Sequence, residues 1–135
     1  MLRIIVALFL VLHGLVHLLY LGQSQRIFEL QPGLVWPDGS WAFSRLPGDE
    51  MTRALASILL LVATLGFVAG GAGIFARQAW WRPAVVGAAI FSAIIYFLLW
   101  DGGWQRLDDK GAVGLLINLA IIVALLVFHW PEFGF

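Results

Sequence analysis

Four long apolar segments limit the possible folds of this chain more than any other feature of its sequence. They cover residues 4–21, 55–75, 83–100 and 112–130. Each would make a helix of roughly 27 Å or more, close to the ~30 Å hydrocarbon core of a bilayer. Charged residues make up only 12% of the chain, whereas soluble domains carry about 25%. We therefore expect an all-α integral membrane protein, with residues 1–135 forming one antiparallel four-helix transmembrane bundle.

The tryptophans and the small residues support this arrangement. The tryptophans lie beside proposed segment ends, at the headgroup level of an aromatic belt: Trp36, Trp41, Trp80, Trp81, Trp100, Trp104 and Trp130. Small residues recur in the second segment, as in the spacing of Gly66 and Gly70, and in the third at Gly87 and Ala88. Because small residues let membrane helices approach closely, we expect the second and third helices to pack tightly.

The long connection over residues 22–50 is rich in aromatic residues, which argues that it folds. Within it, a turn signal at residues 37–40 separates two aromatic-rich arms, 34–36 and 41–43. This pattern predicts a small hairpin. We expect the structured loop between the first and second helices to cap one end of the bundle.

The basic residues set the expected orientation. Arg3, Arg77 and Arg82 fall on the side of the termini, and the last two lie in or beside a very short connection. The basic residues of the other side are spread among acids and a longer loop: Arg26, Arg45, Arg53, Arg106 and Lys110. Since short basic loops are retained in the cytoplasm, we expect both termini to be cytoplasmic.

Two histidines lie inside the first apolar segment. His13 and His17 are four residues apart and so share one helix face, which Tyr20 continues at the next turn. Counted along the helices, Asn118 lies within about 3 Å of the depth of His13, and Ser92 also falls near the middle of its helix. The predicted ligand-binding pocket opens towards the loop and is lined by His13, His17, Tyr20, Ser57, Tyr96 and Asn118.

Three interpretations of the histidine pair are consistent with the sequence. In the first, the imidazoles stabilise helix packing through hydrogen bonds. In the second, they bind a quinone or a lipid headgroup. In the third, they bind a metal or haem. A metal held by His13 and His17 would need further ligands, and no acidic residue lies inside the four segments. Haem held between His13 and His129 of one chain is disfavoured because they differ by roughly 14 Å in depth. The chain has no cysteine, which excludes thiolate ligands.

Several short motifs resemble the DoxX-like family of small bacterial four-helix membrane proteins. They are Arg3, the tripeptide Leu12-His13-Gly14, a glycine-rich second segment ending near Arg77, and Asn118-Leu119-Ala120. The resemblance implies a location in the bacterial inner (plasma) membrane. Some members of that family are small subunits of membrane oxidoreductases such as thiosulfate:quinone oxidoreductase, and many have no known activity. The resemblance assigns no catalytic residue.

The leading functional hypothesis is a non-enzymatic subunit or a module that binds a hydrophobic ligand or lipid. Its expected partners are the lipid bilayer and other membrane-protein subunits or further copies of the chain. The alternative is a quinone-linked redox accessory subunit with a quinone or metal site at His13 and His17. A second alternative is a small transporter or channel. Nucleic acid is set aside as a partner because eight basic and eight acidic residues leave no basic patch.

Overall fold

The expectation of an all-helical chain with apolar helices compatible with a membrane is confirmed. The computed structural model describes residues 1–135 and contains four α-helices, one 3-10 helix and no strand. The helices are α1 (Leu2–Ser24), α2 (Gly48–Phe75), α3 (Trp81–Leu98), η1 (Asp108–Lys110) and α4 (Ala112–Leu126). By length and composition α1, α2 and α3 can each cross a membrane, whereas α4 is apolar but has only 15 residues.

Two helix boundaries differ from those expected. α2 begins at Gly48, well before the apolar segment, because Asp49 and Glu50 in its first turn suit the positive end of the helix dipole. α4 ends at Leu126, short of the expected residue 130. The chain turns there, since His129 has a left-handed backbone with φ of 51°.

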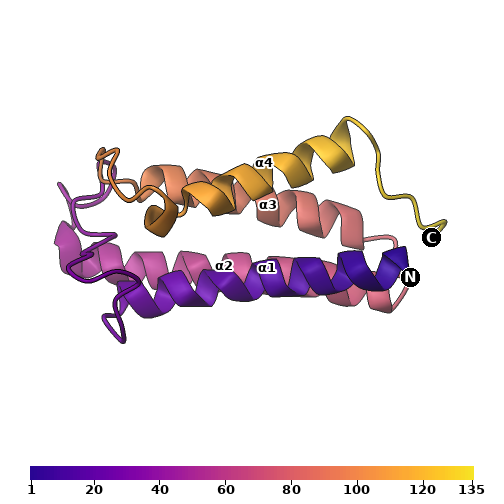
Figure 1. Ribbon diagram of the computed structural model, residues 1–135, viewed down its shortest axis with the longest axis horizontal. Coiled ribbons are helices and arrows are strands. Elements are labelled where there is room, and N and C mark those ends of the chain that lie inside the picture. Colours follow the sequence, from indigo (N-terminus) through magenta and orange to yellow (C-terminus); the bar gives the residue numbers. More distant parts are fainter.

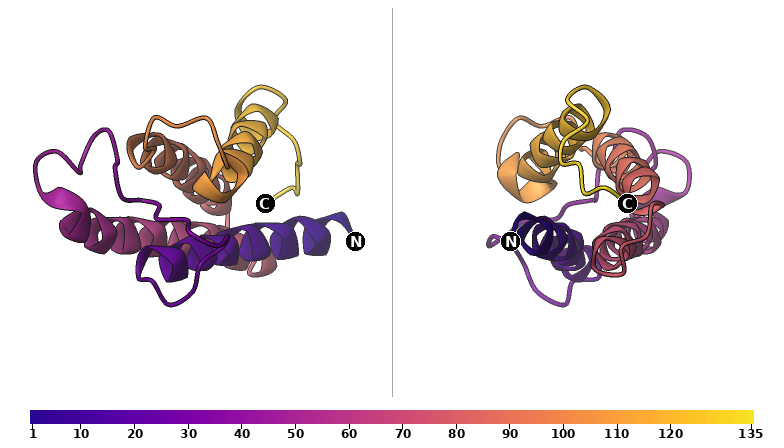
Figure 2. Two further views of the ribbon diagram at one scale, coloured as in Figure 1. Left: turned by 60° about the vertical axis from the view of Figure 1, so that its left-hand side comes forward. Right: turned by 90° about the vertical axis from the view of Figure 1, so that its right-hand side faces the viewer.

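The four α-helices lie along one long axis, and successive helices run in opposite directions (Figure 1). Seen end-on, α1 and α2 form one layer, with α3 and α4 above it (Figure 2). The helices pack in chain order, α1 on α2, α2 on α3 and α3 on α4, whereas α1 and α4 barely approach each other. The ring of helices is therefore least tightly closed between its first and last members.

Two apolar cores lie at different heights along these helices. The core nearer the termini is built around Leu10, Phe67 and Val85, and the core nearer the long loop around Leu60 and Ile95. Buried polar residues occupy the level between them: His13, His17, Ser92 and Asn118. The interior is thus divided into two apolar regions by one polar layer.

The predicted tight packing of α2 on α3 is present in the structure. A Cβ atom at Gly66 would lie only 2.8 Å from the Cβ atom of Ala88. α1 approaches α2 just as closely, a contact that the sequence did not predict. A Cβ atom at Gly71 would lie 2.9 Å from the carbonyl oxygen of Ala7. Glycine is therefore needed on two sides of α2, because larger residues would push the neighbouring backbones apart.

The predicted hairpin in the long loop is wrong, because residues 34–43 form turns and no strand. The loop instead bonds to the end of α3. Ser40 Oγ donates to the carbonyl of Leu98 at 2.7 Å, and Trp41 Nε1 donates to the carbonyl of Phe97 at 2.7 Å. These carbonyls belong to the last turn of α3 and have no partner within the helix. Side chains of the loop therefore supply these carbonyls with donors, and the backbone N–H of Trp41 bonds to the carbonyl of Trp100 at 2.9 Å instead of to a second hairpin arm.

Candidate functional site

The polar layer is a closed set of hydrogen bonds that joins three helices. His13 Nε2 of α1 lies 2.8 Å from Asn118 Oδ1 of α4, and Asn118 Nδ2 lies 2.8 Å from Ser92 Oγ of α3. Ser92 Oγ lies 2.7 Å from His17 Nε2. His17 Nδ1 in turn lies 3.0 Å from the carbonyl oxygen of His13. We call these four residues the polar ring.

The chemistry of each group fixes the direction of every bond in the polar ring. A carbonyl oxygen can only accept, so His17 carries its proton on Nδ1 and accepts at Nε2 from the Ser92 hydroxyl. Ser92 Oγ accepts from the Asn118 amide, and the oxygen of that amide accepts from His13 Nε2. Each of these four hydrogen bonds therefore pairs one donor with one acceptor while both imidazoles are neutral, and neutral groups suit burial at membrane depth.

Aromatic rings enclose the polar ring. Phe67 presents its ring to His13 nearly at right angles, with ring centres 4.7 Å apart. Tyr96 lies beside His17 at 5.6 Å between ring centres, and Phe9 stacks on the other side of His13 at 6.0 Å. The imidazoles are thus held between rings as well as by hydrogen bonds.

The structure brings together only part of the predicted pocket. His13, His17 and Asn118 meet in the polar ring, and Tyr96 lies against it. Tyr20 lies one turn further towards the loop and donates to the carbonyl of Asp108 at 3.0 Å.

Ser57 lies outside this group of side chains. Its hydroxyl donates to the carbonyl of Arg53 and lies 3.4 Å from Ser24 Oγ, at the loop end of α1. Ser92 belongs to the ring but was not among the predicted site residues. Its position in the middle of an otherwise apolar helix was the signal that could have identified it.

The polar ring is poorly suited to bind a metal. Nowhere in residues 1–135 do three His, Cys, Asp or Glu side chains gather as a set of metal ligands. Both nitrogens of His17 are already hydrogen-bonded to Ser92 and to the backbone of His13. A metal on the His13 and His17 pair would have to displace the bonds that connect α1 to α3.

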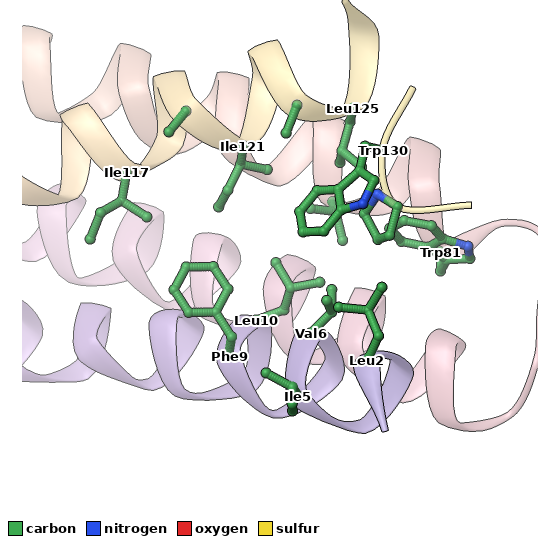
Figure 3. A pocket seen from close by; sticks show the side chains of 14 residues that line it. Leu2, Ile5, Val6, Phe9, Leu10, Trp81, Ile117, Ile121, Leu125 and Trp130 are labelled. Atoms are coloured by element: carbon green, nitrogen blue, oxygen red, sulfur yellow. The ribbon is translucent and has the colours of Figure 1, made fainter. Parts of the chain in front are cut away.

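A second candidate site lies between α1 and α4, where the ring of helices is least closed. It is a cavity of about 450 Å³, and 13 of its 14 lining residues are hydrophobic. Phe9, Val6 and Leu2 of α1 face Ile117, Ile121 and Leu125 of α4 across it, and Trp81 and Trp130 lie at the end nearer the termini (Figure 3). We call this cavity the α1–α4 groove.

The two candidate sites meet at Phe9. Its ring lines the α1–α4 groove and also stacks on His13. Asn118 directly follows the groove residue Ile117. The inner end of the apolar groove therefore lies beside the polar ring, and His13 Nδ1 is the one imidazole nitrogen that takes no part in that ring.

Arg82 holds the outer end of the groove in place. Its guanidinium donates to the carbonyls of Leu125, His129 and Pro131 at 3.1, 3.2 and 2.8 Å. It also lies over the ring of Trp81, 5.3 Å from the ring centre. One side chain of α3 thus fixes the end of α4 and the segment that carries Trp130.

Comparisons with protein-family models, with characterised proteins and with solved structures find no match to this chain. The resemblance to DoxX-like proteins therefore stays a prediction.

Proposed function

We propose that this protein is a non-enzymatic membrane module that binds one hydrophobic chain, such as a lipid acyl chain, in the α1–α4 groove. The observation that carries the proposal is the groove itself. Its lining is almost entirely apolar, and its volume of about 450 Å³ falls within the roughly 300–1,000 Å³ of ordinary ligand pockets. The lining residues of α1 span Leu2 to Leu10, or about 12 Å of helix, which suits an extended hydrocarbon chain.

In this proposal all four α-helices cross the membrane as an antiparallel bundle, with the loop between α1 and α2 over one end. The outward faces of the helices support this placement, since large apolar side chains such as Leu12, Leu65 and Leu116 are more than half exposed. The concentration of Arg3, Arg77 and Arg82 at the other end favours a cytoplasmic position for both termini. The bacterial inner membrane is the location that the DoxX-like resemblance implies.

The polar ring is assigned a structural role in this proposal. Its hydrogen bonds connect α4 to α1 and α3 at the level of the inner end of the groove. Because α1 and α4 have few other contacts, these bonds help to hold the groove open at a fixed width. The ring thereby maintains the binding site and does not itself need to carry out chemistry.

A quinone is the second candidate ligand, and a specific observation favours it. The groove ends at Phe9, next to His13, whose Nδ1 atom is outside the polar ring. A ubiquinol or menaquinol hydroxyl placed there could donate to this nitrogen, while the isoprenoid tail would fill the groove. This arrangement would make the protein a quinone-linked accessory subunit.

The test uses native mass spectrometry of protein released from vesicles into mild detergent. Wild-type protein is expected to retain about one lipid, and Ala120→Trp is expected to lose it, because Ala120 lines the groove. Val123→Trp is the matched control, since Val123 lies on the same helix, is 43% exposed and does not line the groove. Retention that is equal in all three proteins, or absent from the wild type, would refute the proposal. Retained quinone that Ala120→Trp releases would favour the second ligand.

A further inference from the structure

A cavity that contains charged side chains adjoins the outer end of the α1–α4 groove. It has a volume of about 560 Å³ and is lined by the start of α1, by Arg77 and by residues 132–135. Leu2 lines both this cavity and the groove. The two spaces therefore follow one another along the molecule, almost wholly apolar towards the middle and partly polar at the end, where four of the nine lining residues are not hydrophobic.

Two arginines in this cavity have no acidic partner. The ion pairs of the protein join Arg26 and Arg53 to Asp38, and Lys110 to Asp101, all near the long loop. Arg3 and Arg77 form none, although both line the cavity together with Glu132. Among the side chains that line the cavity, two guanidinium groups face a single carboxylate, which leaves an excess of positive side-chain charge at this end of the groove.

Arg82, the third arginine at this end, already makes its hydrogen bonds within the protein. Its guanidinium is occupied by three backbone carbonyls. Trp80 and Trp130 lie near the same end, and both are about half exposed. Since tryptophan collects at the headgroup level of a bilayer, Arg3 and Arg77 would lie where lipid phosphates lie.

We propose that the occupant of the groove is an anionic phospholipid from the surrounding bilayer, with its phosphate held by Arg3 and Arg77. This inference rests on the proposed function, because one acyl chain must lie in the groove for the headgroup to reach the arginines. Guanidinium groups bind phosphate oxygens through paired, charge-assisted hydrogen bonds. An acyl chain at Leu2 and a phosphate in the adjoining cavity satisfy the apolar and the cationic parts of the site at once.

The experiment offers the protein equal amounts of phosphatidylglycerol and phosphatidylcholine with identical acyl chains, and measures the lipids retained after purification. Wild-type protein is expected to be enriched in phosphatidylglycerol. The attraction of an anionic surface for a basic side chain corresponds to about fivefold in affinity for each arginine. The double variant with Arg3→Gln and Arg77→Gln should therefore lose the enrichment but keep its total amount of lipid.

Two further variants make the result decisive. Arg45→Gln removes an unpaired arginine from the long loop, away from the cavity, and should leave the enrichment unchanged. The double variant with Arg3→Lys and Arg77→Lys keeps both charges and should retain most of the enrichment. If the double glutamine variant does not insert, Arg77→Gln alone tests the same point, because Arg77 is exposed.

The failure of this inference is distinguishable from failure of the proposed function. Equal retention of the two lipids by wild-type protein would overturn the headgroup assignment and leave the groove as a binding site for acyl chains. An enrichment that Arg45→Gln reduces as much as Arg77→Gln would also overturn it, since it would reflect net charge only. Absence of any retained lipid would refute the groove itself.

Discussion

Asn118 has more influence on the polar ring than any other single residue. It is the only member of the ring that belongs to α4, and its amide donates to Ser92 of α3 and accepts from His13 of α1. It is fully buried. Removal of this side chain would leave the buried N–H of His13 Nε2 without an acceptor, whereas Ser92 would keep its bond to His17. A buried donor without an acceptor is costly in an apolar surrounding.

The near-isosteric change Asn118→Leu is therefore expected to destabilise the folded protein by about 1 kcal/mol, from two interhelical hydrogen bonds of about 0.6 kcal/mol each. Unfolding in mixed micelles with increasing denaturing detergent measures this. Thr64→Val is the matched control, because the Thr64 hydroxyl donates only to the carbonyl of Leu60 in its own helix. Equal stability of Asn118→Leu and wild type would show that the hydrogen bonds of the polar ring do not stabilise the packing of the helices.

Asp109 provides a prediction about pH at the loop end. Burial and the neighbouring Asp108 carboxylate raise the pKa of Asp109, and its Oδ2 atom is buried without a hydrogen-bond partner. The folded state thus binds this proton more tightly than the unfolded chain, so stability falls as the pH rises above the ordinary carboxyl pKa. Asp109→Asn should slightly raise the melting temperature at pH 7, and the gain should shrink towards pH 4. If the increase in melting temperature caused by Asp109→Asn became larger at lower pH, the pKa of Asp109 would not be raised in the folded protein.

At the residue scale, depth along a helix was predictable near the middle of the bundle but not near the loop end, and direction around a helix was not predictable. His13 and Asn118 were matched by counting 1.5 Å per residue, and they do meet. Ser57 was placed near His17 by the same counting, but α1 continues to Ser24 and the Ser57 hydroxyl lies beside that residue instead. Ser92 has the right depth, yet nothing in the sequence says that it faces Asn118.

At the scale of elements, α2 is the helix around which the others are arranged. Gly66 faces Ala88 of α3, and Gly71 faces the backbone of α1. Glycine spacing predicted the first contact, because a four-residue repeat of small residues is typical of close helix pairs. The second contact depends on where α1 lies around α2, which is a property of the whole packing arrangement.

Gly71→Ala should therefore destabilise the protein by about 1–3 kcal/mol, the usual cost of overpacking. The added carbon would meet the backbone oxygen of Ala7 at 2.9 Å, which cannot move away as a flexible side chain could. Gly87→Ala on α3 is the control, since a Cβ atom there has no neighbour within 4 Å. Thermal unfolding in detergent compares the two. Helix propensity alone favours alanine at both positions, so a Gly71→Ala variant as stable as Gly87→Ala would contradict the contact with α1.

The connections between helices were less predictable than the helices. The arms of the long loop have the composition of a hairpin, but Ser40 and Trp41 bond to the last carbonyls of α3. The left-handed turn at His129 ends α4 early, and Arg82 satisfies the carbonyls around it. In both places a distant element supplies the partner for a helix end, and local sequence patterns do not contain that information.

At the scale of the whole molecule, α1, α2 and α3 form a closely packed unit to which α4 is attached on one side. α4 packs on α3, is linked to α1 through the polar ring, and is fixed at its far end by Arg82. The α1–α4 groove is the space that this arrangement leaves. A lipid in the groove would complete the contact between the first and last helices, so ligand binding and the stability of the bundle should rise together.

The fixed direction of the hydrogen bonds in the polar ring has a consequence for ion movement. A wire of water molecules conducts protons because each molecule can give one proton and take another, and the whole wire can reverse. Here the Asn118 amide interrupts any such exchange, since an amide nitrogen does not readily release a proton to a serine oxygen. The His13 carbonyl at the other end of the ring can only accept. In the proposed membrane orientation, the polar layer would therefore connect the helices without forming a path along which protons could be passed.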